Sequence, residues 1–547
     1  MRTSTYEIFL PLIGTYGKPI EGRALLLNGL YGAVDVVTQE ERELIAAGKF
    51  DRLPSPVFER LSLRGHITRK TEEEEIADMR LLSRIHRAIP AWNEAWLVIM
   101  PTYDCNFRCP YCYEQHRLKN GKEWLSSVMA GGTMDAVFAA VDDHKARGFA
   151  FASCVLYGGE PFLEKNREVV RHIAENCKAR GIKIQAVTNG YELESFLDCI
   201  EEYPFDYLQV TVDGVAELND RRRLHKNGLP TYDRILSNVE LALQRGVGIR
   251  LRVNVGCDNL HGIGALIDDL KARGFIEKEK ARAEEERKLK EKDKNAKTGR
   301  GHFHYFFKAA YDDAHPEKNV SEQAIIDELM KIGFTAEEAI WQERQYIQFA
   351  DRLSVLFRKE SFPRFSPVYC DAERGQVVVD PFGKVYACLD SVAKVENSVG
   401  CVDQDLGRFL WNFNKAKWRV RTTDNLEACV ACPYALNCGG GCGFRANYEH
   451  GSYFREHCGE IREIVAFVAS HLAGREWEKN HDEEMGLSLA EPLSRLTAAE
   501  RETIMTTKGH REIFEILEKL GLLSGKEKET SYENQHVRDF SSAHRCG

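Results

Sequence analysis

Three cysteines stand close together in the stretch PTYDCNFRCPYCYEQ (101–115), where Cys105, Cys109 and Cys112 have the spacing C-x3-C-x2-C. Three thiolates this near one another can bind one soft metal centre. A disulfide uses two sulfurs and a structural zinc site usually needs four ligands, whereas an iron-sulfur cluster held by three cysteines leaves one iron free for a ligand that is not protein. The motif therefore favours such a cluster over zinc and over three unrelated loop cysteines.

A second, larger group of cysteines follows in the C-terminal part of the chain. Glycines at 439–441 and at 443 allow tight turns among them. Zinc is the alternative for the run C-x2-C-x5-C, but zinc would leave the first three cysteines without a matching purpose. The group therefore predicts a site for several metals. Its members are Cys370, Cys388, Cys429, Cys432, Cys438, Cys442 and Cys458.

Turns with glycine and polar residues follow three candidate strands. These turns are YGGEP (157–161), VTNG (187–190) and TVDG (211–214). Glycines let the backbone approach a ligand closely, and Glu160 can accept hydrogen bonds from the ammonium group of a ligand. A Gly-Gly turn after a strand is common, but three polar strand ends in series favour a shared binding site.

The elements that must position these residues alternate between strand and helix. The apolar run AWLVIM (95–100) is typical of a buried strand, so the first cysteine motif lies on a loop after its C-terminal end. The alternation predicts βαβ units with a parallel sheet, and six units predict an α/β fold with an open, partial (β/α)6 TIM-like barrel. Motifs at the strand ends would then share one face. The candidate strands are residues 96–100, 152–157, 182–187, 206–212, 248–255 and 302–308.

Length and composition limit the class of protein. A chain of 547 residues suggests three or four units at ~150 residues per domain. A net charge of -9 does not suggest nucleic-acid binding, and no run of ~18 apolar residues suggests a membrane span. The N-terminus MRTSTYEIFLPL lacks the features of a secretory signal, so we expect a cytoplasmic protein with no nucleic-acid or membrane partner. In a reducing cytosol, sixteen cysteines are expected to serve mainly as metal ligands.

Residues 1–90 have a character of their own. The stretch ALLLNGLYGAVDVV (24–37) predicts two short strands, and Thr38 with Glu41 predicts a capping box before a helix. The stretch VFERLSLRGHITRK (57–70) predicts a second helix followed by a strand. Together these elements predict a small winged-helix-like module.

Residues 277–293 are almost all charged and interrupt the alternation before the sixth candidate strand. We interpret this charged insertion, 277–300, as a solvated helix or a mobile segment, with a docking surface for a partner as the alternative. Beyond Cys458 the sequence predicts helices and shows no recognisable chemistry.

The cysteine triad, the aromatic Tyr111 before its last cysteine, and GGEP at 158–161 together resemble the radical S-adenosylmethionine (SAM) enzymes. The spacing from Cys370 through Cys458 is similar to their SPASM (twitch-type) extension, which carries two auxiliary 4Fe-4S clusters. Within this family the chain resembles maturases of ribosomally made peptides and anaerobic sulfatase-maturing enzymes.

By resemblance, the triad holds a 4Fe-4S cluster whose fourth iron binds the amino and carboxylate groups of SAM. Electron transfer cleaves SAM to methionine and a 5'-deoxyadenosyl radical, which abstracts a hydrogen atom from the substrate. The three cysteines would thus be catalytic. The implied cofactor-binding residues are Gly158, Gly159 and Glu160 near the methionine amino group, Tyr111 near the adenine, and Asn189 and Asp213 elsewhere beside the cofactor.

In the SPASM part, the resemblance implies two ligand sets. Some members have a further cysteine just before the first SPASM cysteine, but here FPRFSPVYC (362–370) has Arg364 and no second thiol. Either Cys401 supplies the fourth proximal ligand or one iron is open. The implied distal ligands are Cys429, Cys432, Cys438 and Cys458, and the implied proximal ligands are Cys370, Cys388 and Cys442.

The N-terminal module resembles the peptide-binding domains that precede such enzymes, which bind a leader segment as an added strand at an exposed sheet edge. The resemblance implies a maturase that installs a thioether or another side-chain crosslink in a ribosomal precursor peptide, with electrons from a flavodoxin- or ferredoxin-type donor. The alternatives are a sulfatase-maturing enzyme, which oxidises Cys or Ser to formylglycine, and a non-catalytic metal-binding scaffold. The expected domains are the peptide-recognition module (1–90), the partial barrel (91–320), a helical linker (321–365), the SPASM domain (366–460) and a C-terminal helical extension (461–547).

Overall fold

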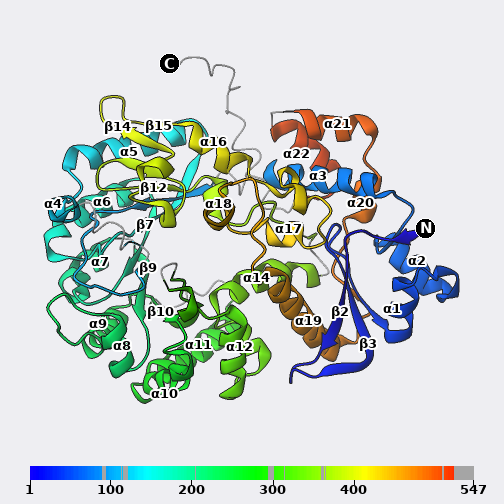
Figure 1. Cartoon of the computed structure of the whole chain (residues 1–547), viewed down its shortest axis with the longest axis horizontal. Coiled ribbons are helices and arrows are strands. Elements are labelled where there is room, and N and C mark those ends of the chain that lie inside the picture. The colour runs from blue at the N-terminus through cyan, green and yellow to red at the C-terminus, as the bar shows by residue number, and fades with distance from the viewer. Residues whose placement is uncertain are drawn as a thin grey trace.

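The computed structural model of the chain describes residues 1–88, 94–112, 114, 121–203, 205–293, 301–312, 315–358, 362–363, 365–507 and 510–522. Arg364 and the last parts of the ranges 277–300 and 461–547 lie outside the described residues. The described part contains a large mixed sheet flanked by helices and a smaller sheet built around the N-terminal strands (Figure 1).

Parallel strands form the centre of the large sheet in the order β11-β10-β9-β8-β7-β6. Every predicted strand corresponds to an observed one, which confirms the predicted α/β fold with an open, partial barrel. The strands are β6 (Glu94–Ile99), β7 (Ala150–Leu156), β8 (Lys183–Thr188), β9 (Phe205–Val212), β10 (Ile249–Val255) and β11 (Phe303–Ala309). The helices between them include α4 (Lys122–Ser126), α5 (Gly131–Ala146), α6 (Arg167–Ala179), α7 (Leu197–Glu202), α8 (Ala216–Arg222), α9 (Tyr232–Gln244) and α10 (Ile263–Ala272).

Strand β10 shows why these segments form a sheet with two different faces. Its sequence IRLRVNV alternates, as expected for a strand with a period of two. Leu251 and Val253 are buried in the hydrophobic core, whereas Arg250 and Arg252 point to the opposite face and keep contact with solvent.

Further strands extend the large sheet beyond β6. Strand β12 pairs with β6 in parallel, with Val378 opposite Val98, and three antiparallel strands follow it. This pairing attaches the segment between Cys370 and Cys388 to the strand that leads into the first cysteine motif. These strands are β12 (Val377–Val379), β13 (Lys384–Tyr386), β14 (Gly400–Asp403) and β15 (Arg408–Trp411). The helices near them include α15 (Asp371–Arg374), α16 (Phe413–Val420), α17 (Ala435–Cys438) and α18 (Gly443–His450).

The smaller sheet has the strand order β16-β4-β3-β2. Strands β3 and β4 confirm the two predicted strands of the N-terminal module, and Thr38 forms the predicted capping box with Glu41 at the start of α1. The elements of the module are β1 (Arg2–Thr3), β2 (Glu7–Ile13), β3 (Pro19–Asn28), β4 (Val34–Thr38), α1 (Gln39–Ala46), α2 (Ser55–Leu63), β5 (Ile67–Thr68) and α3 (Glu72–Ala88).

One edge of this smaller sheet is occupied by the C-terminal part of the same chain. Strand β16 (Glu484–Met485) pairs with β4, with Glu484 opposite Asp35. Arg64 holds this contact, because its guanidinium donates to Met485 O (2.9 Å) and pairs with Asp35 Oδ2 (2.6 Å). Strand β2 lies at the other edge. An added strand at β4 would therefore have to displace β16.

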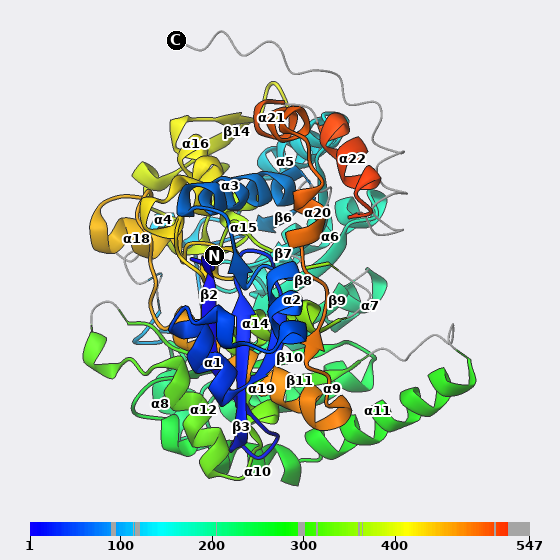
Figure 2. The ribbon, with the colours of Figure 1, turned by 90° about the vertical axis from the view of Figure 1, so that its right-hand side faces the viewer.

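The charged segment forms helix α11 (Phe275–Lys292), which projects from the body of the molecule (Figure 2). Its exposed charges pair along the helix, for example Arg287 with Glu284 (2.8 Å) and with Glu291 (2.8 Å). Such pairs stabilise an exposed helix by ~0.2–0.5 kcal/mol each. The predicted solvated helix is confirmed, whereas a docking role for it stays a prediction.

Helices also fill the ranges after the barrel and after the last cysteines. Helix α19 packs against β2 and joins the C-terminal extension to the N-terminal module (Figure 1). Within the described residues, no helix combines the length and the apolar character needed to cross a membrane. The helices are α12 (Glu322–Lys331), α13 (Ala336–Ile340), α14 (Arg344–Ser354), α19 (Ile461–Asn480), α20 (Ala490–Ser494), α21 (Ala498–Thr506) and α22 (His510–Lys519).

Candidate active site

The first cysteine motif lies on the loop after β6, at the carboxyl edge of the parallel strands, where α/β folds usually place their binding sites. Hydrogen bonds anchor this loop to its surroundings. Thr102 Oγ1 donates to Ser127 O (2.8 Å), and Arg108 N donates to Leu224 O (2.7 Å). The three thiols are therefore carried by a loop whose backbone is fixed on both sides.

Hydrogen-bond donors surround the first thiol of the motif. Phe107 N donates to Cys105 Sγ (3.3 Å), and Asn189 Nδ2 lies 3.9 Å from the same sulfur. Burial raises the pKa of Cys105 well above its usual value, and the charges of Glu160 and Cys109 add to the shift. Since metals bind the thiolate, a metal at this loop would release the proton, and the two N–H groups would then stabilise the charged sulfur.

The two glycines of the YGGEP turn pack against the cysteine loop. Gly158 has a φ of +123°, and a Cβ atom there would lie 2.5 Å from Thr102 O. A Cβ atom on Gly159 would lie 2.0 Å from Asp104 O. Any larger side chain at either position would push away the loop that carries Cys105, so the close approach of these two backbones explains both glycines.

Glu160 is buried behind the cysteine loop. Its carboxylate accepts hydrogen bonds from Thr188 Oγ1 (2.6 Å), Asn189 N (2.6 Å) and Phe162 N (2.9 Å). Burial raises the pKa of Glu160 to about 7, although these donors oppose the shift. The carboxylate ties the end of β7 to the end of β8 and so holds Asn189 beside Cys105.

Tyr111 faces the ends of β9 and β10. Its hydroxyl donates to Asp213 Oδ2 (2.5 Å), and Arg223 Nη1 donates to the same hydroxyl (3.0 Å). Arg222 Nε pairs with Asp213 Oδ2 as well (3.2 Å). Asp213 is fully buried, and in the part of the chain that the structure describes its Oδ1 atom has no hydrogen-bond partner. Sequence reasoning missed both arginines, although the basic run at 221–223 after the TVDG turn was an available signal.

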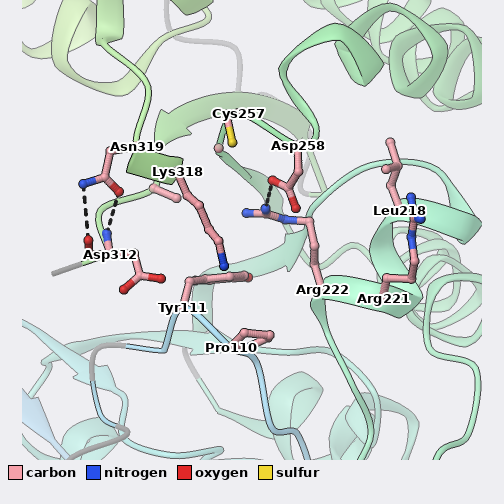
Figure 3. A pocket seen from close by; sticks show the side chains of 12 residues that line it. Pro110, Tyr111, Leu218, Arg221, Arg222, Cys257, Asp258, Asp312, Lys318 and Asn319 are labelled. Carbon is pink, nitrogen blue, oxygen red and sulfur yellow. Dashed lines mark hydrogen bonds and ion pairs between the residues drawn. The ribbon is translucent and has the colours of Figure 1, made fainter. Parts of the chain in front are cut away.

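A pocket of about 370 Å³ opens beside Tyr111 at the ends of β10 and β11 (Figure 3). Cys257 and Ala310, which follow these two strands, line the pocket. Arg222 pairs with Asp258 in its wall, and Lys318 extends toward the Tyr111 ring. Its volume is in the range of pockets that bind small molecules.

The C-terminal cysteines separate into two sets in the structure. In the first set, burial raises the pKa of Cys429 to about 12, and Cys438, Cys432 and Cys458 contribute through their charges. Arg462 Nη2 donates to Cys432 Sγ (3.8 Å). The structure thus brings together the residues that the resemblance implied for the distal cluster.

The second set contains Cys370, Cys388 and Cys442. Burial raises the pKa of Cys370 well above its usual value, and Glu373, Cys388 and Cys442 add to the shift. Glu373 Oε2 accepts hydrogen bonds from the Cys370 backbone N–H (2.9 Å) and from its thiol (3.3 Å). Glu373 was not predicted as a site residue, and its position three residues after a helix-capping Cys370 was the only signal in the sequence.

A buried arginine links this second set to the first. Arg421 pairs with Glu373 Oε1 (3.1 Å) and donates to Gly440 O (2.9 Å) and Gly441 O (2.8 Å), which lie between Cys438 and Cys442. Neither Arg421 nor Glu373 exposes its side chain to solvent. One guanidinium therefore fixes the backbone that carries cysteines of both sets.

A zinc site requires ligand atoms that lie close to one another. In a tetrahedral site with Zn–S bonds of ≈ 2.3 Å, the sulfurs lie about 3.8 Å apart. Among the described residues, three potential metal ligands lie within 4.8 Å of one another, namely Glu279, His302 and His304, near the start of β11. No three cysteines of the described residues meet that limit. The three residues of this group come from outside both cysteine regions of the sequence.

The segment around the first cysteine motif also matches a known protein family. Residues 99–270 match the radical SAM superfamily. The segment that carries the first cysteine motif is therefore similar to radical SAM domains. The chain's matching segment is similar to the S-adenosylmethionine-dependent nucleotide dehydratase of Psychrobacter lutiphocae, with 26% identity over 166 residues, which cover 29% of this chain and 55% of that protein. It is also similar to the Fe-coproporphyrin III synthase of Methanosarcina barkeri, with 24% identity over 190 residues, which cover 35% and 42%. The chain spans about half the length of these curated relatives.

Two solved structures are similar to larger parts of the chain, at lower sequence identity. Native anSMEcpe with bound AdoMet and Cp18Cys peptide has a TM-score of 0.47 and 18% identity, covering 68% of this chain and 96% of that chain. Streptococcus suis SuiB bound to precursor peptide SuiA has a TM-score of 0.45 and 14% identity, covering 84% of this chain and 100% of that chain.

The segment similar to radical SAM domains offers donors that fit a 4Fe-4S cluster with three protein ligands. Its loop supplies three soft thiols, two N–H groups near one of them, and the nearby cation of Arg223, which opposes the burial-driven rise in the pKa of Cys109. Asp213, whose Oδ1 atom has no hydrogen-bond partner among the described residues, and the pocket beside Tyr111 lie at the same strand edge and could hold a small molecule.

Proposed function

We propose that this chain is a radical SAM peptide maturase, which abstracts a hydrogen atom from a residue of a ribosomally made peptide and installs a thioether or another side-chain crosslink. The observation that carries the proposal is the pairing of β12 with β6, because it joins the radical SAM loop and a second, cysteine-rich region in one sheet. A shared sheet fixes the position of the two cysteine regions relative to each other, which supports chemistry that passes an electron from one metal centre to another.

Under this proposal, Cys105, Cys109 and Cys112 hold a 4Fe-4S cluster that binds SAM. When bound, the cluster and SAM together supply a 5'-deoxyadenosyl radical that abstracts a hydrogen atom. Glu160 and Asn189 hold the loop in place, and Gly158 and Gly159 let the β7 end approach it. In this proposal Glu160 also flanks the methionine amino group, and Tyr111, oriented by Asp213, contacts the adenine. The distal set of four cysteines and the proximal set with Glu373 hold the auxiliary clusters.

The names of these two curated relatives refer to a nucleotide and a porphyrin. Support for a peptide substrate comes instead from the N-terminal module. A sheet with an available edge can align an extended peptide through backbone hydrogen bonds. Because β16 occupies the β4 edge, we propose that the leader adds at β2 or displaces β16. A flavodoxin- or ferredoxin-type protein would supply the electrons.

The product distinguishes this proposal from a sulfatase-maturing activity. The reconstituted enzyme would be incubated with SAM, dithionite and a synthetic precursor peptide taken from a short reading frame beside its gene. Mass spectrometry should show loss of a hydrogen pair and protection of one cysteine from alkylation. A sulfatase-motif peptide converted to formylglycine, with the precursor peptide unchanged, would instead establish the alternative.

Cys401 tests how the proximal cluster is closed. In the structure this residue lies on β14, opposite Lys384 and Leu410, whereas the group in contact with Cys370 is Glu373. We therefore expect Cys401→Ala to keep the full iron content, about twelve irons for three 4Fe-4S clusters. Loss of about four irons, measured by iron assay and EPR, would show instead that Cys401 is the fourth proximal ligand.

A further inference from the structure

The inner face of the open barrel is unlike the core that a closed barrel would have. Cross-strand register defines this face, since Arg250 lies opposite Gln209 of β9 and His304 of β11, and Arg252 lies opposite Thr211 and Phe306. Closed barrels fill this position with layers of branched apolar side chains. Here the inner positions of β9 to β11 are mostly polar or cationic. They are Gln209, Thr211, Arg250, Arg252, Asn254, His304, Phe306 and Lys308.

Part of this face is open to solvent. Arg250 and His304 are exposed and Arg252, Phe306 and Lys308 are half-buried. The opposite face of the same strands is mostly buried, with Leu251 and Phe307 both 0% exposed. The inner face is therefore a surface on which a ligand can lie.

The inner face also reaches the candidate active site. Asn254, the inner residue two positions beyond Arg252, donates through Nδ2 to the Tyr111 hydroxyl (3.4 Å). Asp213, at the corresponding end of β9, accepts a hydrogen bond from the same hydroxyl. A ligand that lies along Arg250 and Arg252 would thus extend toward Tyr111 and the cysteine loop.

Among the described residues, the two arginines on this face lack carboxylate partners. Arg250 stacks over the Tyr207 ring (3.7 Å), and Arg252 Nε donates to Asn254 Oδ1 (2.8 Å). Neither arginine forms an ion pair with any residue that the structure describes, although the chain as a whole has a net charge of -9. Unpaired guanidinium groups on a concave surface favour an anionic ligand, which they bind through paired N–H groups.

Carboxylates lie near the other two basic residues of this face, with Glu279 within 4.8 Å of His304 and two glutamates near Lys308. Glu343 is buried beside Lys308, where burial raises the pKa of Glu343 to about 7, and Glu322 lies within electrostatic reach of both. Arg344 adds a further cation near Lys308. The two charged residues of β10 itself, Arg250 and Arg252, are both positive.

We propose that the inner face formed by Arg250 and Arg252 binds an acidic segment of the substrate peptide, whose Asp or Glu side chains pair with the two arginines while a neighbouring residue reaches Tyr111. The two arginines are two residues apart on one strand, so their side chains are separated by about 6.6 Å, the spacing of alternate side chains in an extended peptide. This inference rests on the proposed peptide maturase and names its substrate as acidic near the modified residue.

The test measures binding to the reconstituted holoenzyme by fluorescence anisotropy. The probe is a short fluorescein-labelled peptide of alternating Gly and Glu, compared with Gly/Gln and Gly/Lys peptides. We expect only the acidic peptide, and neither control peptide, to bind. Its Kd should rise at least about tenfold in the double variant Arg250→Gln/Arg252→Gln, because two charge-assisted pairs are lost. Arg245→Gln, which removes an exposed cation on the outer side after α9, should leave the Kd unchanged.

A further variant, the control peptides and a competing nucleotide distinguish the possible outcomes. Arg250→Glu should transfer binding to the Gly/Lys peptide. Because this is a single change at an exposed position, it replaces the double variant in the test if the double variant loses iron or unfolds at a lower temperature. Equal binding of the Gly/Gln peptide, or an unchanged Kd in the double variant, would overturn the inference. Displacement of the probe by GTP more strongly than by unlabelled Gly/Glu peptide would overturn it too, because the anion would then be a phosphate. Peptide crosslinking that persists without acidic-peptide binding would reject this inference and leave the proposed function intact.

Discussion

SAM cleavage should disappear completely when Cys105, Cys109 and Cys112 are replaced by alanine, while the auxiliary clusters remain. The three thiols lie on one anchored loop, and removing all of them removes every proposed protein ligand of the first cluster. The auxiliary sets depend on other residues, so the protein should keep about eight of about twelve irons. Iron assay, EPR and chromatography of 5'-deoxyadenosine would measure the two effects in one preparation.

The matched control for this variant is Cys154→Ala, Cys177→Ala and Cys199→Ala, which removes three buried core cysteines outside both cysteine regions. This control should keep its iron content and cleave SAM. Retained cleavage in the first triple variant would reject the assignment of the loop, whereas loss of all iron would show that the three metal sites do not form independently.

Replacement of Arg421 by methionine should have the largest effect on stability. Arg421 pairs with Glu373 and donates to the carbonyl groups of Gly440, Gly441, Tyr453 and Arg455. Removing one partner of a buried pair leaves an uncompensated charge, which costs about 3–5 kcal/mol. Because the carbonyl groups lie between cysteines of both C-terminal sets, the iron content should also fall toward about four.

Arg419→Met is the control for this prediction. Arg419 is a near neighbour on the same segment, exposed, with a hydrogen bond to Arg374 O (2.7 Å). Urea unfolding should show a much smaller shift for Arg419→Met than for Arg421→Met. Equal shifts in the two variants, with both keeping full iron, would contradict a special role for the buried guanidinium.

Local patterns predicted the elements of the fold well. Apolar runs such as AWLVIM and alternating runs such as IRLRVNV placed the parallel strands, and Thr38 with Glu41 placed the start of α1. Pairings between distant segments were not predictable in this way. The β12 pairing with β6 and the β16 pairing with β4 depend on very short strands that carry little sequence signal.

The candidate site was predictable in part. Spacing alone marked the first cysteine loop, but the division of the C-terminal cysteines into two sets came from family resemblance. Glu373 and Arg421 escaped notice because their roles arise from packing across the fold. The alternating arginines of β10 were visible in IRLRVNV, yet only the register of β9 to β11 shows that they share an open face.

The proposed function predicts where the abstracted hydrogen comes from. Reconstituted enzyme would be given SAM, dithionite and a precursor peptide deuterated on its side chains, and the mass of the resulting 5'-deoxyadenosine would be measured. Deuterium in 5'-deoxyadenosine, together with loss of a hydrogen pair from the peptide, is the result that a peptide maturase predicts. Unlabelled 5'-deoxyadenosine formed at the same rate with and without peptide, while the peptide mass stays constant, would contradict the proposal.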